Sequence, residues 1–300
     1  MDKEREGILL SVLTSAMGFA YFCNKKMLLF LNVETSTFLW FSLGSLFYLS
    51  YILPSKRRKK MKILLTELKK VSAIAIFTGI GAILWFQGTV VAQPTNVAFI
   101  FQFSRVFTVL AGILLLGERL SPREGLGVLL ALTGGFILTY TGEEARILNN
   151  LVLLASASSY AASHILAKIY VKDVDPISLA AGRTMLAAVL LFFYSLATGR
   201  LDLAVPLEAL SWALLGAFIA PFLAVIFYYE AFKRVELSKV AAIISTQPFF
   251  TALYAVLFFA TLPSLWQMVG GSIVTLGVMV LTSSRRSELR SRKPDGAPRE

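Results

Sequence analysis

Long apolar stretches separated by short polar segments cover almost the whole 300-residue chain. A helix needs an apolar stretch of about 20 residues to cross a lipid bilayer. Stretches of about this length can be marked at 7–30, 36–53, 71–92, 96–116, 122–141, 148–171, 176–198, 208–233, 238–260 and 264–284. The pattern therefore predicts an all-α integral membrane protein with ten transmembrane helices, and it leaves no room for a separate soluble domain.

The second half of the chain repeats the first at an offset of 143 residues. The block 96–139 aligns without a gap with 239–282. Identical pairs at this offset are Val97 with Val240, Phe107 with Phe250, Gly127 with Gly270, Gly134 with Gly277 and, outside the block, Lys25 with Lys168 (168 − 25 = 143). Because each copy contains five predicted spans, an odd number, the second copy must enter the membrane upside down. We expect two inverted five-helix repeats, at 1–143 and 144–286, followed by a basic tail at 287–300.

Basic residues concentrate in alternate loops. The segment 55–70 carries eight Lys or Arg residues, and further basic residues lie on the same side, two spans at a time, up to the tail. Cytoplasmic loops of membrane proteins are enriched in this way, so we expect a multi-pass protein of the cell (inner, cytoplasmic) membrane with both termini cytoplasmic. This distribution accounts for the net charge of +11 without a nucleic-acid partner. The start, 1–6, is more acidic than basic, which favours a retained first helix over a signal peptide.

Composition narrows the class of protein further. With 56% hydrophobic and 16% charged residues the chain is too apolar for a soluble protein. A single histidine and a single cysteine, Cys23, provide no metal cluster, and no catalytic triad or phosphate-binding loop is visible. We therefore expect no enzyme, no metal and no cofactor. Inverted repeats are typical of secondary transporters, in which two similar halves rock about a central site.

Two further local patterns recur in both copies. Gly134 and Gly277 each follow another glycine by seven residues, and small residues on one helical face allow close backbone packing. We interpret them as structural. The last span of each copy begins with a serine followed three residues later by Glu or Gln, such as Ser264 and Gln267 in the second copy, which predicts a capping box.

These residues resemble a known family. The sequence AGILLLGERLSPREGLGVLLALTGGFIL, with 117–120 as its most specific part, is similar to the end of an EamA repeat of the drug/metabolite transporter superfamily. The segment 240–259, VAAIISTQPFFTALYAVLFF, resembles the family's ninth helix, with Pro248 at a position that is commonly proline. The resemblance covers the whole chain as two repeats. It implies a ten-helix carrier with cytoplasmic termini that moves a small metabolite, often an amino acid or related compound, and usually outward in bacterial members.

The resemblance also implies that the first four helices of each half line a central cavity, with the fifth and tenth packing outside it. Two positions depart from the pattern. The expected Gly-Glu of the second copy is Ala260-Thr261, and the residue equivalent to Pro248 is Arg105 (248 − 143 = 105). An arginine near the bilayer midplane costs about 2.5–3.5 kcal/mol unless it faces a wet cavity or a partner.

Arg105 is therefore a candidate for holding a carboxylate or phosphate of the substrate; the alternative is a structural pairing with an acidic residue or with exposed helix carbonyls. Asn96 and Gln102 on the same span would add donors, or else bond a neighbouring helix. Trp85, Tyr160 and Tyr228 are candidate aromatic contacts, which would favour an aromatic substrate or a cation.

Titratable groups inside the spans suggest other roles. Glu230 is the only carboxylate well inside an apolar stretch; it either carries a coupling proton or pairs with the basic residues one turn later. Its repeat mate is the neutral Gln87 (230 − 143 = 87), a further candidate for substrate contact. His164, the sole histidine, is a second candidate for proton coupling, or a packing residue. Arg183, seven residues into its span, is within reach of the membrane interface.

Lys25 and Lys168 are grouped with Pro248, Gly134 and Gly277 as structural or gating positions, since both lysines lie near span ends. The sequence thus predicts an exporting secondary transporter for a small metabolite such as an amino acid or a related anionic or zwitterionic compound. It would work by alternating access as a monomer or weak dimer, with proton coupling left open. The alternatives are an exporter of drugs or cationic aromatic compounds and, less favoured, a polytopic membrane enzyme.

Overall fold

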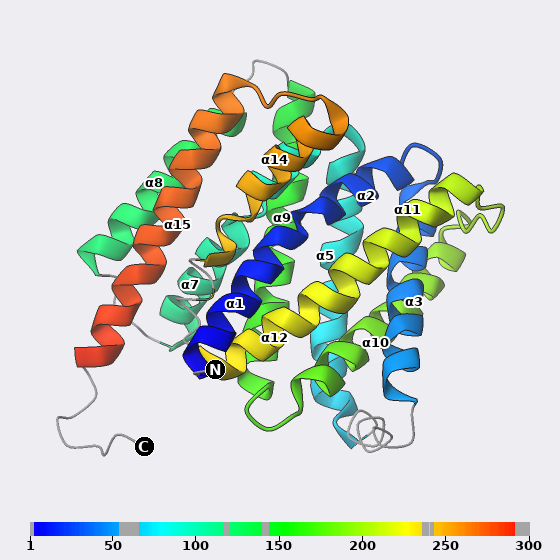
Figure 1. The fold of residues 1–300 in the computed structure, drawn as a ribbon, viewed down its shortest axis with the longest axis horizontal. Coiled ribbons are helices and arrows are strands. Elements are labelled where there is room, and N and C mark those ends of the chain that lie inside the picture. Colours follow the sequence, from blue (N-terminus) through cyan, green and yellow to red (C-terminus); the bar gives the residue numbers. More distant parts are fainter. Residues whose placement is uncertain are drawn as a thin grey trace.

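The computed structural model describes residues 3–53, 66–116, 121–139, 144–235, 240 and 243–291, and every regular element in them is helical. In the first repeat the elements are α1 (Lys3–Ala16), η1 (Met17–Phe19), α2 (Ala20–Met27), α3 (Val33–Ile52), α5 (Leu68–Val91), α6 (Pro94–Ile100), α7 (Phe103–Leu116) and α8 (Pro122–Thr139). In the second they are α9 (Glu144–Tyr170), α10 (Pro176–Ala197), α11 (Leu207–Ala217), η3 (Phe218–Ala224), α12 (Val225–Arg234), α14 (Gln247–Phe259) and α15 (Leu265–Ser291). Figure 1 shows them as one bundle of long, tilted helices.

The elements follow the ten predicted spans. Helical runs long and apolar enough to cross a membrane are Lys3–Met27, Leu68–Val91, Ile147–Tyr170, Pro176–Ala197 and Leu207–Arg234, and shorter apolar helices are Gly125–Ile137, Gln247–Phe259 and Leu265–Val280. Several spans consist of more than one element: α1, η1 and α2 form the first, α6 and α7 the fourth, and α11, η3 and α12 the eighth. The predicted fold class, ten helices in two repeats, is confirmed.

The packing of α8 against α15 shows that the repeats are inverted. A Cβ atom placed on Gly134 would lie 2.6 Å from the carbonyl oxygen of Gly270, and one on Gly277 would lie 2.7 Å from that of Gly127. The contact of Gly134 with Gly270 and the contact of Gly127 with Gly277 are therefore equivalent under the repeat offset (127 + 143 = 270; 134 + 143 = 277). Only an antiparallel pair related by an approximate two-fold axis gives this pattern. Gly134 and Gly277 therefore lie where the backbones of the two helices approach closely.

The α8–α15 pair lies at one side of the bundle (Figure 1). Its outer surface is apolar: Leu129, Phe136 and Leu276 are all more than half exposed. Exposed apolar side chains on a membrane helix face lipid hydrocarbon. The fifth and tenth spans therefore lie outside the remaining helices, as the family resemblance implies.

Serine hydroxyls join α5 to α9 across the boundary between the repeats. Ser156 donates to the carbonyl oxygen of Gly81 and Ser159 to that of Phe77, each at 2.7 Å. Such bonds to backbone carbonyls are a common means of association between helices in a bilayer, where apolar burial provides no driving force. These hydrogen bonds fix α5 against α9 near the centre of the molecule.

Helix caps repeat at the same offset. The Asn32 side chain accepts from the Thr35 amide at 2.8 Å, and its mate Asp175 (175 − 32 = 143) accepts from the Ser178 amide at 3.0 Å. These bonds satisfy amide groups that have no partner within the helix. The start of α3 and the start of α10 are therefore fixed in the same way in both halves.

Two features noted in the sequence lie at the two ends of the loop before α15. Ser264 and Gln267 form the predicted capping box, with the Ser264 amide donating to Gln267 Oε1 at 2.9 Å and the Gln267 amide donating to Ser264 Oγ at 3.2 Å. Ala260, where the family pattern has glycine, ends α14 with a φ of 47°. That left-handed conformation favours glycine, so the alanine is strained.

Candidate functional site

Helical geometry breaks near the centre of four spans. The breaks are the 3₁₀ turn η1, the turn at Phe101–Gln102, the π-helical turn η3, which contains Pro221, and the turn at Ser245–Thr246. Non-helical backbone at membrane depth is tolerated only where it is buried in protein or lines a cavity. All four breaks contribute to, or directly adjoin, the lining of one central cavity.

The cavity has a volume of about 150 Å³ and is lined by residues from both repeats. Many of the lining residues are repeat mates. These pairs are Met17 and Tyr160, Tyr21 and His164, Trp40 and Arg183, Trp85 and Tyr228, Phe101 and Ile244, and Ser104 and Gln247. Residues related by the approximate two-fold axis can meet only near that axis, so the cavity lies between the two halves.

Arg105 lies in the cavity wall, in the first turn of α7 just after the break at Phe101–Gln102. Its side chain is 9% exposed, and Nη1 donates to Gln102 Oε1 at 2.5 Å. Its Nε is buried and has no hydrogen-bond partner among the described residues. Its mate, Pro248, is buried in the first turn of α14. Proline is tolerated there because an amide hydrogen in the first turn would have no partner within the helix.

Arg183 is a second cavity-lining arginine, contributed by α10. It is 5% exposed, and its Nε donates to Thr78 Oγ1 on α5 at 2.8 Å. The Thr78 hydroxyl is in turn 2.8 Å from that of Ser163, and the Arg183 guanidinium lies 5.9 Å from the ring centre of Tyr160. The sequence placed Arg183 only within reach of the interface, whereas the structure places it in the cavity. The repeat offset could have identified Arg183, because it replaces an aromatic residue, Trp40, at the equivalent position of the first copy (183 − 143 = 40).

Aromatic rings make up much of the remaining wall. Trp85 packs edge-on against Tyr21 and Trp40, with ring centres 5.6 and 5.9 Å apart. Tyr228 packs against His164 at 5.0 Å. Tyr160 contacts Phe101, at 5.2 Å, and completes the predicted set of Trp85, Tyr160 and Tyr228 in the lining. The site is thus a cavity with a mainly apolar and aromatic wall that also contains two guanidinium groups.

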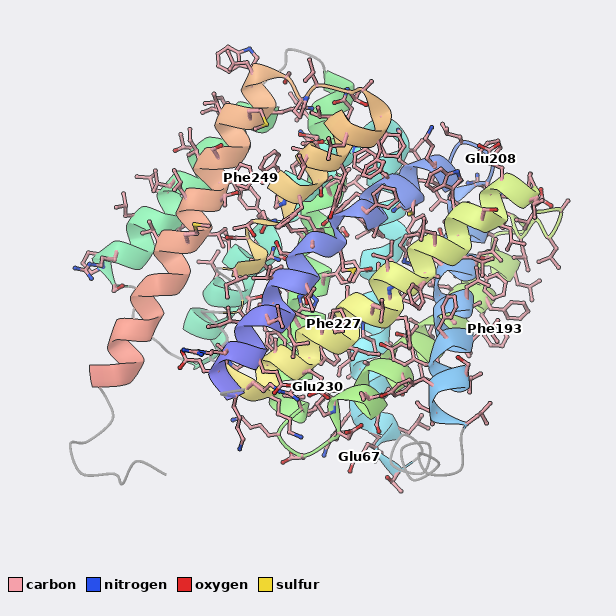
Figure 2. The ribbon with its side chains drawn as sticks, in the orientation of Figure 1. Glu67, Phe193, Glu208, Phe227, Glu230 and Phe249 are labelled. Carbon is pink, nitrogen blue, oxygen red and sulfur yellow. The ribbon has the colours of Figure 1, made fainter. Side chains whose placement is uncertain are left out.

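The described carboxylates lie away from this cavity. Among the described residues, no acidic side chain lines the cavity and no ion pair joins a carboxylate to Arg105 or Arg183. Glu230 instead lies in α12 one turn before its end, in the lower part of the molecule in Figure 2, and pairs with Arg234. Arg234 also pairs with Glu6 of α1 at 3.1 Å. Within the described residues, no three His, Cys, Asp or Glu side chains come together as a bound metal ion would require.

The remaining predicted residues lie outside the cavity. Gln102 is buried beside it and holds Arg105. Asn96 bonds Asn150 at 3.3 Å in a separate polar pocket next to the loop before α15. Gln87 lines a third pocket, beside the loop that joins α2 to α3.

The two lysines lie near helix ends. Lys25 donates to the carbonyl oxygens of Thr89 and Val90, at 3.0 and 2.6 Å, and so satisfies the end of α5. Lys168 is half-buried in the last turn of α9.

Polar contacts join the two repeats at both ends of the first span. Near the N-terminus Glu6 meets Arg234, as described above. At the opposite end of the first span, Asn32 donates to the Arg200 carbonyl at 2.8 Å, and Arg200 pairs with Glu34 at 3.2 Å. The cavity is therefore bracketed along the first span by contacts between the two halves.

A central cavity between inverted repeats, lined by broken helices, defines the class: this is a membrane transporter. Comparison with known proteins gives the family. The model of the EamA-like transporter family matches residues 5–140 and again residues 148–283. The chain therefore belongs to the EamA-like transporter family, within the drug/metabolite transporter superfamily.

Individual relatives agree with this assignment. An uncharacterized transporter of Methanothermobacter thermautotrophicus is 25% identical over 232 residues, which cover 75% of this chain and 65% of the relative. The uncharacterized transporter YyaM of Bacillus subtilis is 24% identical over 229 residues, covering 71% of this chain and 74% of the relative. The chain thus matches just under two thirds of the length of the first relative. A crystal structure with a TM-score of 0.63 and 18% identity, covering 95% of this chain and 98% of its own, has the same fold.

Proposed function

We propose that this transporter is a secondary carrier that exports a small anionic or zwitterionic metabolite, such as an amino acid or a related compound, by alternating access. The repeats 1–143 and 144–286 would rock about the central cavity, in the cell membrane, with both termini and the tail 287–300 on the cytoplasmic side. The two-fold arrangement of the lining supports this, because each half supplies equivalent positions to one site.

The observation that carries the proposal is the state of Arg105. A buried charge is normally paired, since desolvation is expensive. Arg105 has no carboxylate partner among the described residues and keeps a buried Nε without an acceptor, while Gln102 accepts a hydrogen bond from its Nη1. A substrate carboxylate would supply the missing acceptor in the bidentate geometry that arginine favours.

The aromatic wall gives one argument for the alternative substrate, a cationic aromatic compound, because ring faces attract cations. The charges in the wall oppose it. A cation in the cavity would lie with Arg105 and Arg183 and would find no acidic residue in the part of the lining that the structure describes. The cavity therefore favours anions.

If transport is coupled to protons, the cavity offers His164 as the titratable group in direct reach of the substrate. The Glu230 carboxylate is engaged by Arg234 at the end of α12. Loss of proton dependence in a folded His164→Gln variant is the expected result for a coupled carrier. Transport that ignores the pH gradient in the unaltered protein would remove proton coupling from the proposal.

The test is uptake into proteoliposomes of labelled amino acids, organic acids and cationic dyes, with and without a pH gradient. Hydrogen bonds to a charged group contribute about 1.5–3 kcal/mol, and about 1.4 kcal/mol is a factor of ten. Arg105→Ala should therefore lower transport efficiency for the accepted anion about 10- to 100-fold. Arg123→Ala, an exposed position at the start of α8, is the matched control. Unimpaired transport by a well-folded Arg105→Ala variant would reject the anchoring role.

A further inference from the structure

We propose that the cavity is built for a dianion, with one negative group of the substrate on Arg105 and the other on Arg183. This rests on the proposed function and narrows it, because a carrier for monoanions or zwitterions needs only one of these arginines. The shared chemistry is two anionic groups on one small molecule, of which a short dicarboxylate is the simplest case.

The two arginines present free edges of the kind that binds anions. The Nε of Arg183 donates to Thr78, and no hydrogen bond among the described residues occupies its terminal nitrogens, although the Tyr229 hydroxyl lies close enough to interact with the guanidinium. In Arg105 the Nη1 is used by Gln102, so the Nε and Nη2 edge is left. Each guanidinium is thus held by one neutral side chain that fixes its orientation without neutralising its charge. Two adjacent donors in one plane are what a carboxylate or phosphate accepts.

The guanidinium groups of both arginines belong to the wall of one cavity, which is large enough for a small ligand. Arg105 and Arg183 line the same cavity of about 150 Å³ and come from opposite repeats. His164 and Tyr228, whose ring centres are 5.0 Å apart, line this cavity as well. A ligand that fills the cavity therefore contacts a wall that contains both arginines.

Several other cations in the described part of the chain are compensated. Arg200 pairs with Glu34, Arg234 pairs with Glu6 and Glu230, and Lys25 caps the carbonyl end of α5. Arg105 and Arg183, by contrast, are buried, and no contact among the described residues joins either of them to a carboxylate. Two cations in a low-dielectric site repel each other, and a monoanion would leave one of them uncompensated.

A zwitterion fits this arrangement less well. If its carboxylate bound Arg105, its ammonium group would lie in a cavity whose described lining residues include a second guanidinium and no carboxylate. A dianion would compensate both guanidinium charges and would bring no ammonium group into the cavity. Because the arginines belong to different repeats, such a substrate would also bridge the halves that move against each other.

The test uses three ligands of nearly equal size: succinate, a dianion; succinamate, in which an amide replaces one carboxylate; and β-alanine, a zwitterion. Binding is measured by concentration-dependent thermal stabilisation of the purified full-length protein, and transport by competition with labelled succinate in proteoliposomes. The unaltered protein should prefer succinate over succinamate about 10- to 100-fold. Arg183→Gln should abolish that preference, Arg183→Lys should keep part of it, and Arg123→Gln should keep all of it.

Each result has a separate meaning. Equal binding of succinate and succinamate, both dependent on Arg105, would overturn the dianion inference and leave the proposed function standing. Preference for β-alanine would do the same. Failure of all three ligands to bind, together with no transport of any anion of the larger panel, would overturn the proposed function itself. If Arg183→Gln does not fold, the preference of the unaltered protein and of Arg183→Lys still decides the matter.

Discussion

Gly216 is the position at which the smallest change should alter the cavity wall. A Cβ atom on this residue of α11 would lie 2.0 Å from Cζ3 and 2.3 Å from Cη2 of Trp40, and 2.8 Å from the Cβ of Cys23. Carbon atoms pack at about 3.5–4.0 Å. In Gly216→Ala the indole must therefore move by about 1.5 Å or more. Its other neighbours are the rings of Trp85 and Phe86, at 5.9 and 5.6 Å between centres, so the open direction is the cavity.

The size of the effect follows from comparison with Gly79→Ala. A Cβ on Gly79, in α5, meets no atom within 4 Å. Both substitutions gain the same helix propensity, about 1 kcal/mol, so this gain cancels between them. The overpacking at Gly216 then remains, at about 1–3 kcal/mol. Gly216→Ala should thus be less stable than Gly79→Ala by that amount, and it should show a raised KM that increases with substrate size.

Thermal unfolding in detergent and proteoliposome uptake measure the two effects. The double variant Gly216→Ala with Trp40→Phe is the control for the mechanism, because the smaller ring should relieve the contact and restore part of the stability. Equal melting temperatures and equal KM values for Gly216→Ala and Gly79→Ala would refute the reasoning, since the ring of Trp40 would then not be confined between α11 and the cavity.

Two further predictions concern residues away from the cavity. Glu230→Gln should leave transport and its dependence on a pH gradient within about twofold of the unaltered protein, because Arg234 keeps Glu6 and partly exposed ion pairs contribute only about 0–1 kcal/mol; loss of gradient dependence in proteoliposomes would instead make Glu230 a coupling residue. Ala260→Gly should raise the melting temperature, because the left-handed conformation at φ 47° costs an alanine about 1–2 kcal/mol while the added freedom of glycine in the unfolded chain costs only about 0.4–1 kcal/mol; a lower melting temperature would contradict the strain at this residue.

The architecture was largely predictable because its signals are local or periodic. The length of an apolar stretch predicts a span without any knowledge of its neighbours, and the 143-residue offset with five spans per copy predicts inversion. The same offset identified Arg105 as unusual, since its equivalent is Pro248. These conclusions depend on sequence spacing alone, and the antiparallel contact between Gly134 and Gly270 agrees with them.

The sequence by itself determined that the chain spans a membrane as two inverted copies, since these properties depend on apolar length and on an odd number of spans. Only the tertiary structure decided which side chains share the cavity. Arg183 and Glu230 are both charged residues within apolar spans, yet the first faces the cavity and the second pairs with Arg234 at a helix end. Direction around a helix depends on how that helix packs and where its backbone breaks. In this protein both are set by contacts between halves that lie 143 residues apart in the sequence.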